Sequence, residues 1–371
     1  MVHVDYQLPI KGRLKPMADG NIVHVVGTGT IGEPLIGLLC DAKDDLEIDE
    51  VTFYKHSPVL TDRPKIKGLT NRGGNLAVSD HKLKEFQELG LEPMYEAEEA
   101  IKRASVVVDC TPKGTGMMNK EKYYDKYKKK VKGFLAQGSE FGFGKMFAVG
   151  INDEAIKPKD QFIHIVSCNT HNIAALINTL GIENGKNFLK EGRFLCMRRA
   201  NDISQVSSFI PSPEVGSHKD KLMGTHHAVD VYHLYKTIGI DLNVFSSALK
   251  LNTQYMHSIW YDLKLNKKIT KDKVIQKFID NPRVAVTHKK SANLVFSFGR
   301  DHGHYGRILD QTVIVIPSIH VINDNEVFGF CFTPQDGNSI LSSISIVERF
   351  LFPDSYQEKL NFLGAFLLQE V

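Results

Sequence analysis

The stretch IVHVVGTGTIGEPLIGLLC, residues 22–40, decides the fold. Residues 22–26 are mostly β-branched and predict a strand buried on both faces. The turn GTGTIG follows at once, and the apolar run 33–40 predicts a helix. Strand, tight glycine turn and helix in this order match the dinucleotide-binding fingerprint GxGxxG, in which a pyrophosphate lies at the helix N-terminus. Its glycines are Gly27, Gly29 and Gly32; a purely structural glycine turn is the alternative.

Strands and helices alternate from this stretch as far as residue 166. Further strands are predicted at 50–54, 106–112, 131–136 and 163–166, with helices at 82–89, 96–103 and 120–130. This alternation predicts an α/β fold with a doubly wound, mostly parallel sheet of the Rossmann type. We therefore expect residues 1–166 to form an NAD(P)-binding domain.

The pattern changes after residue 166. Strands are predicted at 193–199 and 205–210, a strand pair at 241–251 and 255–263, and a hairpin from 314–321 and 327–332 around the turn 323–325. Long antiparallel strands with a few helices indicate an α+β catalytic domain with a largely antiparallel sheet, at 167–336. The apolar helices 339–350 and 357–368 belong to a C-terminal segment, 337–371, expected to pack back on the first domain.

The residues after the predicted strand 50–54 bear on cofactor preference. An acidic residue there would bind the ribose hydroxyls of NAD, but this chain has Lys55, His56 and Ser57. A cation beside a hydroxyl donor suits the additional phosphate of NADP. The alternative is a solvated loop without a ligand.

A second strand-to-helix junction carries the candidate nucleophile. In IHIVSCNTHNIAAL, residues 163–176, a β-branched strand leads to Ser-Cys-Asn-Thr and then to helical spacing. Cys168 would lie beside unpaired N–H groups and the positive end of the helix dipole, and both stabilise a thiolate. The alternative is a buried structural cysteine.

Composition limits the class of protein. The chain has 371 residues, which favours two domains, and a formal net charge of +3, which gives no argument for nucleic acid. Its five cysteines are scattered and odd in number, as in a reduced, cytoplasmic protein. No signal peptide or membrane span is expected. The basic run 126–132 is interpreted as a solvated helix end, with a polyanion site as the alternative.

Two further clusters suit anions. Arg198 and Arg199 are neighbours on a predicted strand, where guanidinium groups bind phosphate or carboxylate, or simply lie on the surface. His226 and His227 open a predicted helix. No cysteine joins them, so anion binding at a helix start is favoured over a metal, and no metal is predicted.

A nicotinamide site, a helix-start cysteine and anion-binding groups fit aldehyde oxidation through a thioester. The thiolate attacks the aldehyde, hydride passes to the nicotinamide, and phosphate or water releases the acyl group. A histidine is needed as general base.

With these motifs in place, the chain resembles the archaeal, or type II, glyceraldehyde-3-phosphate dehydrogenases. The matching pieces are GTGTIG, VVDCTP, AQGSE, VSCNT, MRRA, FIPSP, THHAVD, LKLNTQYMHS, NPRVAV and PQD, in the same order. The resemblance implies that Cys168 is the nucleophile and His257 the base. It implies cofactor contacts from Thr30, Ile31, Ser139, Arg199 and Gln335, and substrate contacts from Ser167, Asn169, His226 and His227. It also implies glyceraldehyde 3-phosphate and inorganic phosphate as substrates, NADP or NAD as cofactor, and a homotetramer.

Two departures from the family pattern concern the aldehyde pocket. SCNTTG appears here as SCNTHN, which puts His171 and Asn172 beside the nucleophile, and SHHGPD appears as THHAVD. A related semialdehyde dehydrogenase or acyl-phosphate reductase, acting on an amino-acid-derived substrate, is therefore a second hypothesis. A catalytically silent nucleotide-binding protein is the third.

Overall fold

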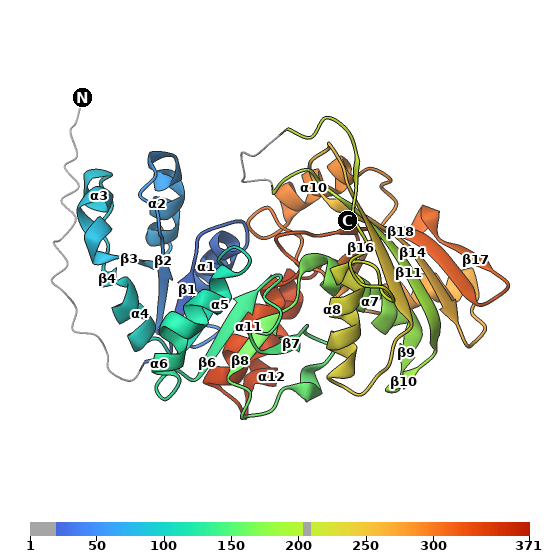
Figure 1. Ribbon diagram of the computed structural model, residues 1–371, viewed down its shortest axis with the longest axis horizontal. Helices are drawn as coiled ribbons and strands as arrows, with labels where there is room; N and C mark the ends of the chain where they lie inside the picture. Colours follow the sequence, from blue (N-terminus) through green and yellow to red (C-terminus); the bar gives the residue numbers. More distant parts are fainter. Residues whose placement is uncertain (1–19, 203–208) are drawn as a thin grey trace.

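The computed structural model describes residues 20–202 and 209–371, which form two sheets with their helices (Figure 1). The N-terminal residues 1–19 and most of the strand predicted at 205–210 lie outside the described residues.

The first sheet has eight strands, all parallel, in the order β4-β3-β2-β1-β5-β6-β8-β7. The strands are β1 (Ile22–Val26), β2 (Glu50–Tyr54), β3 (Asn75–Val78), β4 (Tyr95–Glu96), β5 (Val106–Asp109), β6 (Gly133–Gln137), β7 (Lys145–Phe147) and β8 (Phe162–Ile165). The chain winds outward from β1 in both directions, so the predicted doubly wound α/β sheet is confirmed.

The helices of this first unit differ from the prediction in two places. They are α1 (Gly32–Asp41), α2 (Arg63–Asn71), α3 (Leu83–Glu88), α4 (Ala97–Arg103), α5 (Thr115–Asn119) and α6 (Asp125–Tyr127), with a π-helical turn at Lys120–Tyr124. The sequence pattern missed α2, because only Ile66 and Leu69 of this helix are buried and give it little apolar periodicity. The helix predicted at 120–130 begins earlier, with α5, and ends at Tyr127, with the π-helical turn between α5 and α6.

The second sheet is mixed and mostly antiparallel. Its order is β12-β13-β11-β14-β18-β16-β15, with β17 paired to β18. The strands are β11 (Leu189–Arg198), β12 (Glu214–Val215), β13 (Val244–Lys250), β14 (His257–Leu265), β15 (Val284–Thr287), β16 (Thr312–Val315), β17 (His320–Ile322) and β18 (Glu326–Thr333); β9 (Ile182–Glu183) and β10 (Lys186–Asn187) pair separately. The helices are α7 (Cys168–Gly181), α8 (His226–Lys236), α9 (Lys271–Ile279) and α10 (Ala292–His302).

The strand pair predicted from 241–251 and 255–263 is wrong. Both segments are strands, β13 and β14, but β11 lies between them, parallel to β13 and antiparallel to β14. The connection from β11 to β13 contains α8, and a helical crossover returns the chain in the parallel direction. The predicted hairpin is present as β17 and β18, and Asn323 and Asp324 in its turn both have positive φ.

The C-terminal segment returns to the first sheet. It consists of α11 (Ile340–Leu351), α12 (Tyr356–Lys359) and a 3₁₀ helix (Leu360–Phe366). Ile344 and Val347 of α11 lie in the same core cluster as Val23 and Leu135 of the first sheet. The end of the chain therefore contributes to the first core. No helix in the described ranges is long and apolar enough to cross a membrane.

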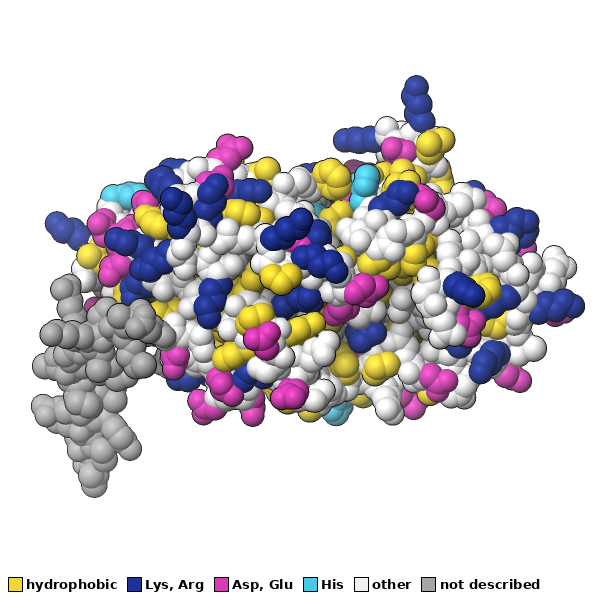
Figure 2. Space-filling model, turned by 90° about the horizontal axis from the view of Figure 1, so that it is seen from below, with side chains coloured by type: hydrophobic (Ala, Val, Ile, Leu, Met, Phe, Trp, Pro, Cys, Tyr) yellow, Lys and Arg dark blue, Asp and Glu magenta, His cyan; other side chains and the backbone are white. Residues whose placement is uncertain are grey.

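Surface charges of both signs are interspersed on the face shown in Figure 2. Within the basic run 126–132, Lys126 lies 3.5 Å from Glu98 and Lys128 lies 3.6 Å from Asp125. These contacts favour the interpretation of the run as a solvated helix end.

Candidate active site

Cys168 is the first residue of α7, which follows β8 of the first sheet and packs in the core of the second unit. The chain therefore crosses from one unit to the other at the candidate nucleophile. Ser167 caps the helix, because its Oγ accepts a hydrogen bond from the Thr170 N–H at 3.5 Å. Asn338 Nδ2 donates to the Cys168 carbonyl at 2.9 Å and holds the junction.

The thiol of Cys168 is not poised as a thiolate. Desolvation, with the negative charge of Asp336, raises its pKa to about 12. The charges of Arg199 and Arg198 and the backbone N–H of Asn169 act in the opposite direction but do not outweigh these two effects. The surroundings of the thiol therefore favour its protonated form. A ligand or a base must help to remove the proton.

His257 is the first residue of β14 and is buried. Its Nδ1 accepts a hydrogen bond from the Arg199 N–H at 2.9 Å, so the proton of the neutral ring lies on Nε2. Burial and the positive charges of Arg199 and Arg198 hold the pKa of His257 well below its usual value. The ring is therefore neutral, with an N–H donor at Nε2. Because the same two guanidinium groups act on the Cys168 thiol, both candidate catalytic groups share one electrostatic environment.

Arg199 and Gln335 lie together beside this pair. Arg199 Nη2 lies 3.0 Å from Asp202 and 2.9 Å from Asp336, and Gln335 Nε2 donates to the same Asp202 at 3.1 Å. Both side chains line one small pocket. Arg199 Nε and Gln335 Oε1 are buried and have no partner within the described part of the chain. The two residues that the resemblance assigns to the cofactor therefore lie together at one pocket.

His226 and His227 open α8, with ring centroids 4.0 Å apart. Only 3% of His227 is exposed, and neither of its ring nitrogens has a hydrogen-bond partner among the described residues. Desolvation, together with the positive charges of Arg198, Lys113 and Lys219, lowers the pKa of His226 to about 4, although the residue as a whole is exposed. This positive environment at a helix start suits an anion. Within residues 20–202 and 209–371, no cluster of His, Cys, Asp and Glu could hold a metal ion.

Asn169 does not present its side chain to an open pocket. It is 1% exposed, and its Oδ1 accepts a hydrogen bond from Thr333 Oγ1 at 3.1 Å, while Asn172 Nδ2 donates to the same hydroxyl at 2.8 Å. The backbone N–H of Asn169, rather than its amide side chain, acts on the thiol.

His171 and Asn172, which depart from the family pattern beside the nucleophile, make packing contacts. His171 is fully buried, with Nδ1 at 3.1 Å from the Ser167 carbonyl and Nε2 at 2.8 Å from Ser342 Oγ on α11. Asn172 is tied to β18 through Thr333. Both side chains are therefore occupied in the contact between α7 and its neighbours.

The glycine turn at 27–32 fits a pyrophosphate. Gly27 has φ +100°, and a Cβ on Gly32 would lie 2.1 Å from the Gly27 carbonyl oxygen. Only glycine fits these two positions, which hold the turn open at the start of α1. Ile31 is the N-cap of α1 and makes no side-chain capping bond, so the helix N–H groups are not capped by a side chain there. Thr30 lies in the same turn.

The other predicted cofactor residues follow the carboxyl ends of two strands of the first sheet, which are separated by β1 and β5. Lys55 and Ser57 follow β2, and Ser139 follows β6. Lys65, on the missed helix α2, also reaches this region: its Nζ donates to the Thr28 carbonyl at 3.2 Å. Asp62-Arg63-Pro64 is a helix-start signal that identifies α2 in retrospect.

No family model matches the chain. Several curated proteins are similar to it over most of their length. Glyceraldehyde-3-phosphate dehydrogenase from Methanobacterium bryantii is 30% identical over 342 residues, 89% of this chain and 93% of the relative. The chain belongs to the glyceraldehyde-3-phosphate dehydrogenase family. Relatives of the same name from Metallosphaera sedula and Methanopyrus kandleri are also 30% identical, each over 82% of this chain and 85% of the relative.

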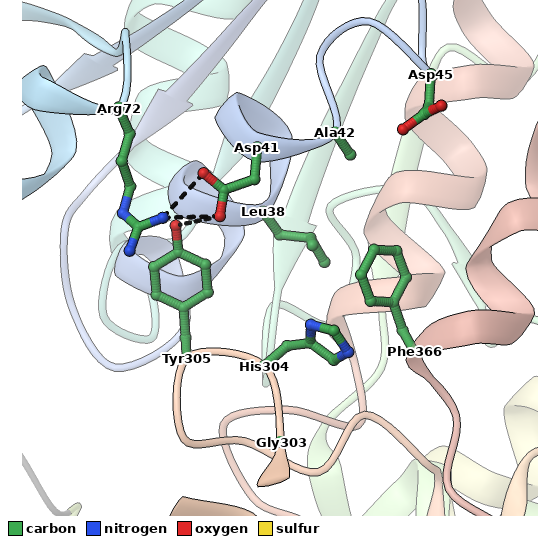
Figure 3. Close-up of a pocket in the computed structure, with 9 residues that line it drawn as sticks. All are labelled: Leu38, Asp41, Ala42, Asp45, Arg72, Gly303, His304, Tyr305 and Phe366. Atoms are coloured by element: carbon green, nitrogen blue, oxygen red, sulfur yellow. Dashed lines mark hydrogen bonds and ion pairs between the residues drawn. The ribbon is translucent and has the colours of Figure 1, made fainter. Parts of the chain in front are cut away.

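A separate pocket of about 390 Å³ lies at the other end of α1 from the glycine turn. Figure 3 shows Tyr305, from the second unit, beside Asp41 and Arg72 of the first. The Tyr305 hydroxyl donates to Asp41 at 3.1 Å, and Arg72 donates to both oxygens of the same carboxylate at 2.9 and 2.8 Å. A Cβ on Gly37 would collide with the Tyr305 ring. In this dehydrogenase-family chain, the contact ties α1 to the second unit.

Proposed function

We propose that this protein oxidises glyceraldehyde 3-phosphate to 1,3-bisphosphoglycerate, or catalyses the reverse reaction, through a thioester on Cys168. We propose NADP as the preferred cofactor, with NAD also accepted. The observation that carries the proposal is the position of Cys168 at the junction of the two units, beside buried Arg199 and within the same charge environment as His257. Membership of the family supports the choice of substrate.

The proposed chemistry begins at the thiol. Cys168 Sγ forms a bond to the aldehyde carbon, and its proton is transferred to the resulting alkoxide oxygen. A bound nicotinamide would supply the hydride acceptor for this step. The carbon on Cys168 becomes a thioester carbonyl when it has lost the hydride and its hydroxyl group has lost the proton. An oxygen of inorganic phosphate then attacks the carbonyl, the C–S bond breaks, and the Cys168 thiolate leaves.

His257 is the group proposed to move protons at this site. In the neutral ring its Nε2 carries the proton, which suits a hydrogen bond to the developing alkoxide oxygen. Accepting the hydroxyl proton requires the other tautomer, in which Nδ1 no longer accepts from the Arg199 N–H. The neighbouring positive charges lower its pKa and favour rapid return to the neutral ring.

The anionic parts of both substrates are assigned to the positive groups of the second unit. His226 and His227 at the start of α8, with the charge of Arg198 nearby, would bind phosphate. Ser167 and Asn169 would contribute through the backbone and the helix cap rather than through free side chains. Gly27, Gly29, Thr30, Ile31 and Gly32 would hold the cofactor pyrophosphate, and Ser139, Arg199 and Gln335 the nicotinamide end.

A homotetramer is proposed from the outer face of the second sheet. Trp260 and Phe330 are directly opposed on β14 and β18, and 42% of Phe330 is exposed. Asp262, on the same face, has a buried carboxylate oxygen without a hydrogen-bond partner in the described residues. An aromatic surface of this kind is typical of subunit interfaces. Light scattering of the purified protein measures the oligomeric state, and a monomer would contradict this part of the proposal.

The central experiment is a spectrophotometric assay with glyceraldehyde 3-phosphate, with and without inorganic phosphate, using each nicotinamide cofactor. We expect reduction that depends on phosphate and is faster with NADP. Activity only with an amino-acid-derived semialdehyde would favour the related semialdehyde dehydrogenase. Binding of cofactor without turnover of any aldehyde would indicate the silent nucleotide-binding protein.

A further inference from the structure

The end of β2 carries an electrostatic cluster that the glycine fingerprint does not explain. Lys55 directly follows β2, at the position where a Rossmann sheet contacts the adenosine ribose of its cofactor. Its Nζ lies 2.8 Å from the Asp62 carboxylate, and only 14% of the Lys55 side chain is exposed. Lys55 is therefore already paired within its own chain.

Lys65 brings a second ammonium group to the same carboxylate. Its Nζ lies 3.3 Å from the other oxygen of Asp62 and 3.2 Å from the Thr28 carbonyl oxygen in the glycine turn. Only 21% of its side chain is exposed. Lys65 thus connects the glycine turn to the end of β2, the two segments between which the ribose of a bound dinucleotide lies.

Asp62 is held between the two lysines rather than used to build the helix. It precedes α2 but makes no side-chain capping bond. Burial raises the pKa of Asp62, but the hydrogen bond and charge of Lys55 and the charge of Lys65 outweigh burial and hold the pKa below its usual value. The carboxylate is therefore ionised and bridges two ammonium groups.

We propose that Lys65 joins Lys55 in binding the 2′-phosphate of NADP, and that Asp62 occupies the phosphate's place while no phosphate is bound. A phosphate dianion can satisfy both ammonium groups, as the carboxylate does now. When the cofactor lacks this phosphate, Asp62 remains between the lysines and can accept a hydrogen bond from the ribose hydroxyl. Asp62 and Lys65 thereby set the preference between the two cofactors. This inference rests on the proposed function.

Equilibrium titration of the full-length protein with NADPH and NADH, followed by nicotinamide fluorescence, tests the proposal. Lys65→Gln should weaken the binding of NADPH by at least about tenfold and the binding of NADH by less than about twofold. Asp62→Asn removes the charge that competes with the 2′-phosphate. It should tighten the binding of NADPH by about threefold or more without tightening the binding of NADH. Lys67→Gln is the matched control, since Lys67 is exposed on the same helix, and should change neither constant.

Adenosine 2′,5′-bisphosphate and ADP separate the phosphate contact from the rest of the dinucleotide. Lys65→Gln should weaken the binding of adenosine 2′,5′-bisphosphate but not the binding of ADP. Equal losses for NADPH and NADH would overturn the proposal, because Lys65 would then act on the glycine turn through Thr28. If the ratio of the NADPH and NADH dissociation constants is unchanged in Asp62→Asn, the proposed role of Asp62 is overturned. Both outcomes leave the dehydrogenase assignment intact, whereas wild-type protein that binds neither cofactor overturns both proposals.

Discussion

Two strand-to-helix junctions of this protein, β1 to α1 and β8 to α7, differ in which chemical groups they expose to a ligand. Between β1 and α1 the turn is glycine-rich, and the N-cap Ile31 makes no side-chain bond, so the helix N–H groups can receive a ligand. Between β8 and α7 the cap is Ser167, and the cysteine that follows is only partly exposed and lies near the charge of Asp336. Desolvation and this carboxylate raise the pKa of the thiol, so a position at a helix N-terminus does not by itself favour the thiolate.

Replacing the candidate nucleophile should have the largest effect, and this effect should be confined to the second junction. Cys168→Ser should lower phosphate-dependent turnover by at least about 10³-fold, because the hydroxyl is a far weaker nucleophile in thioester chemistry. Cofactor affinity should change by less than about twofold, since the first junction is untouched. Steady-state kinetics and cofactor titration measure the two effects. Retained turnover in Cys168→Ser would contradict the assignment of Cys168 as the nucleophile.

The converse change acts on the first junction. Gly32→Ala places a Cβ 2.1 Å from the Gly27 carbonyl oxygen, and the turn must shift. We expect both cofactors to bind at least about 100-fold more weakly, from the lost pyrophosphate contacts. Gly68→Ala, where a Cβ meets no atom within 4 Å, is the control. Unaltered affinity in Gly32→Ala would show that the turn does not hold the cofactor.

His171 tests what supports the second junction. Burial lowers its pKa to about 4, from 6.5 in an unfolded chain. Stability from the neutral ring is therefore fully present above pH 6.5 and lost as the pH falls through about 4. Wild-type protein should lose about 3 kcal/mol of unfolding free energy between pH 7 and pH 4 that His171→Thr does not lose. Urea unfolding at both pH values measures this difference.

The exposed His81 supplies the control for that comparison. His81→Thr should keep the wild-type pH dependence. Equal slopes for wild type and His171→Thr would mean that the ring is not buried and neutral in solution.

The smallest expected effect concerns the charge beside the thiol. Asp336→Asn removes the carboxylate that raises the pKa of Cys168 and frees Arg199 to lower it. Alkylation of Cys168 at pH 8 should become about three- to tenfold faster, as followed by mass spectrometry. Asp202→Asn also removes a partner of Arg199, yet Asp202 is not among the charges that act on the thiol, so the rate should change little.

Features that depend on neighbouring residues were predictable from the sequence. The strand, turn and helix at 22–40 appear as predicted, because β-branched residues, glycine turns and apolar runs act over a few residues. The placement of β11 between β13 and β14 was not predictable, since it depends on where α8 returns the chain. The position of Lys65 near the glycine turn was also not predicted from the sequence. Its helix has few apolar positions, and Lys65 contacts Thr28, which is distant from it in the sequence.

The sequence by itself determined the doubly wound sheet, the glycine turn and the identity of the candidate nucleophile, because each is encoded in a contiguous stretch. Only the tertiary structure decided the ionisation of Cys168, the tautomer of His257 and the packing role of His171. These properties depend on burial and on charges brought from other strands and helices, and Coulomb and desolvation energies follow distance in space rather than position in the chain.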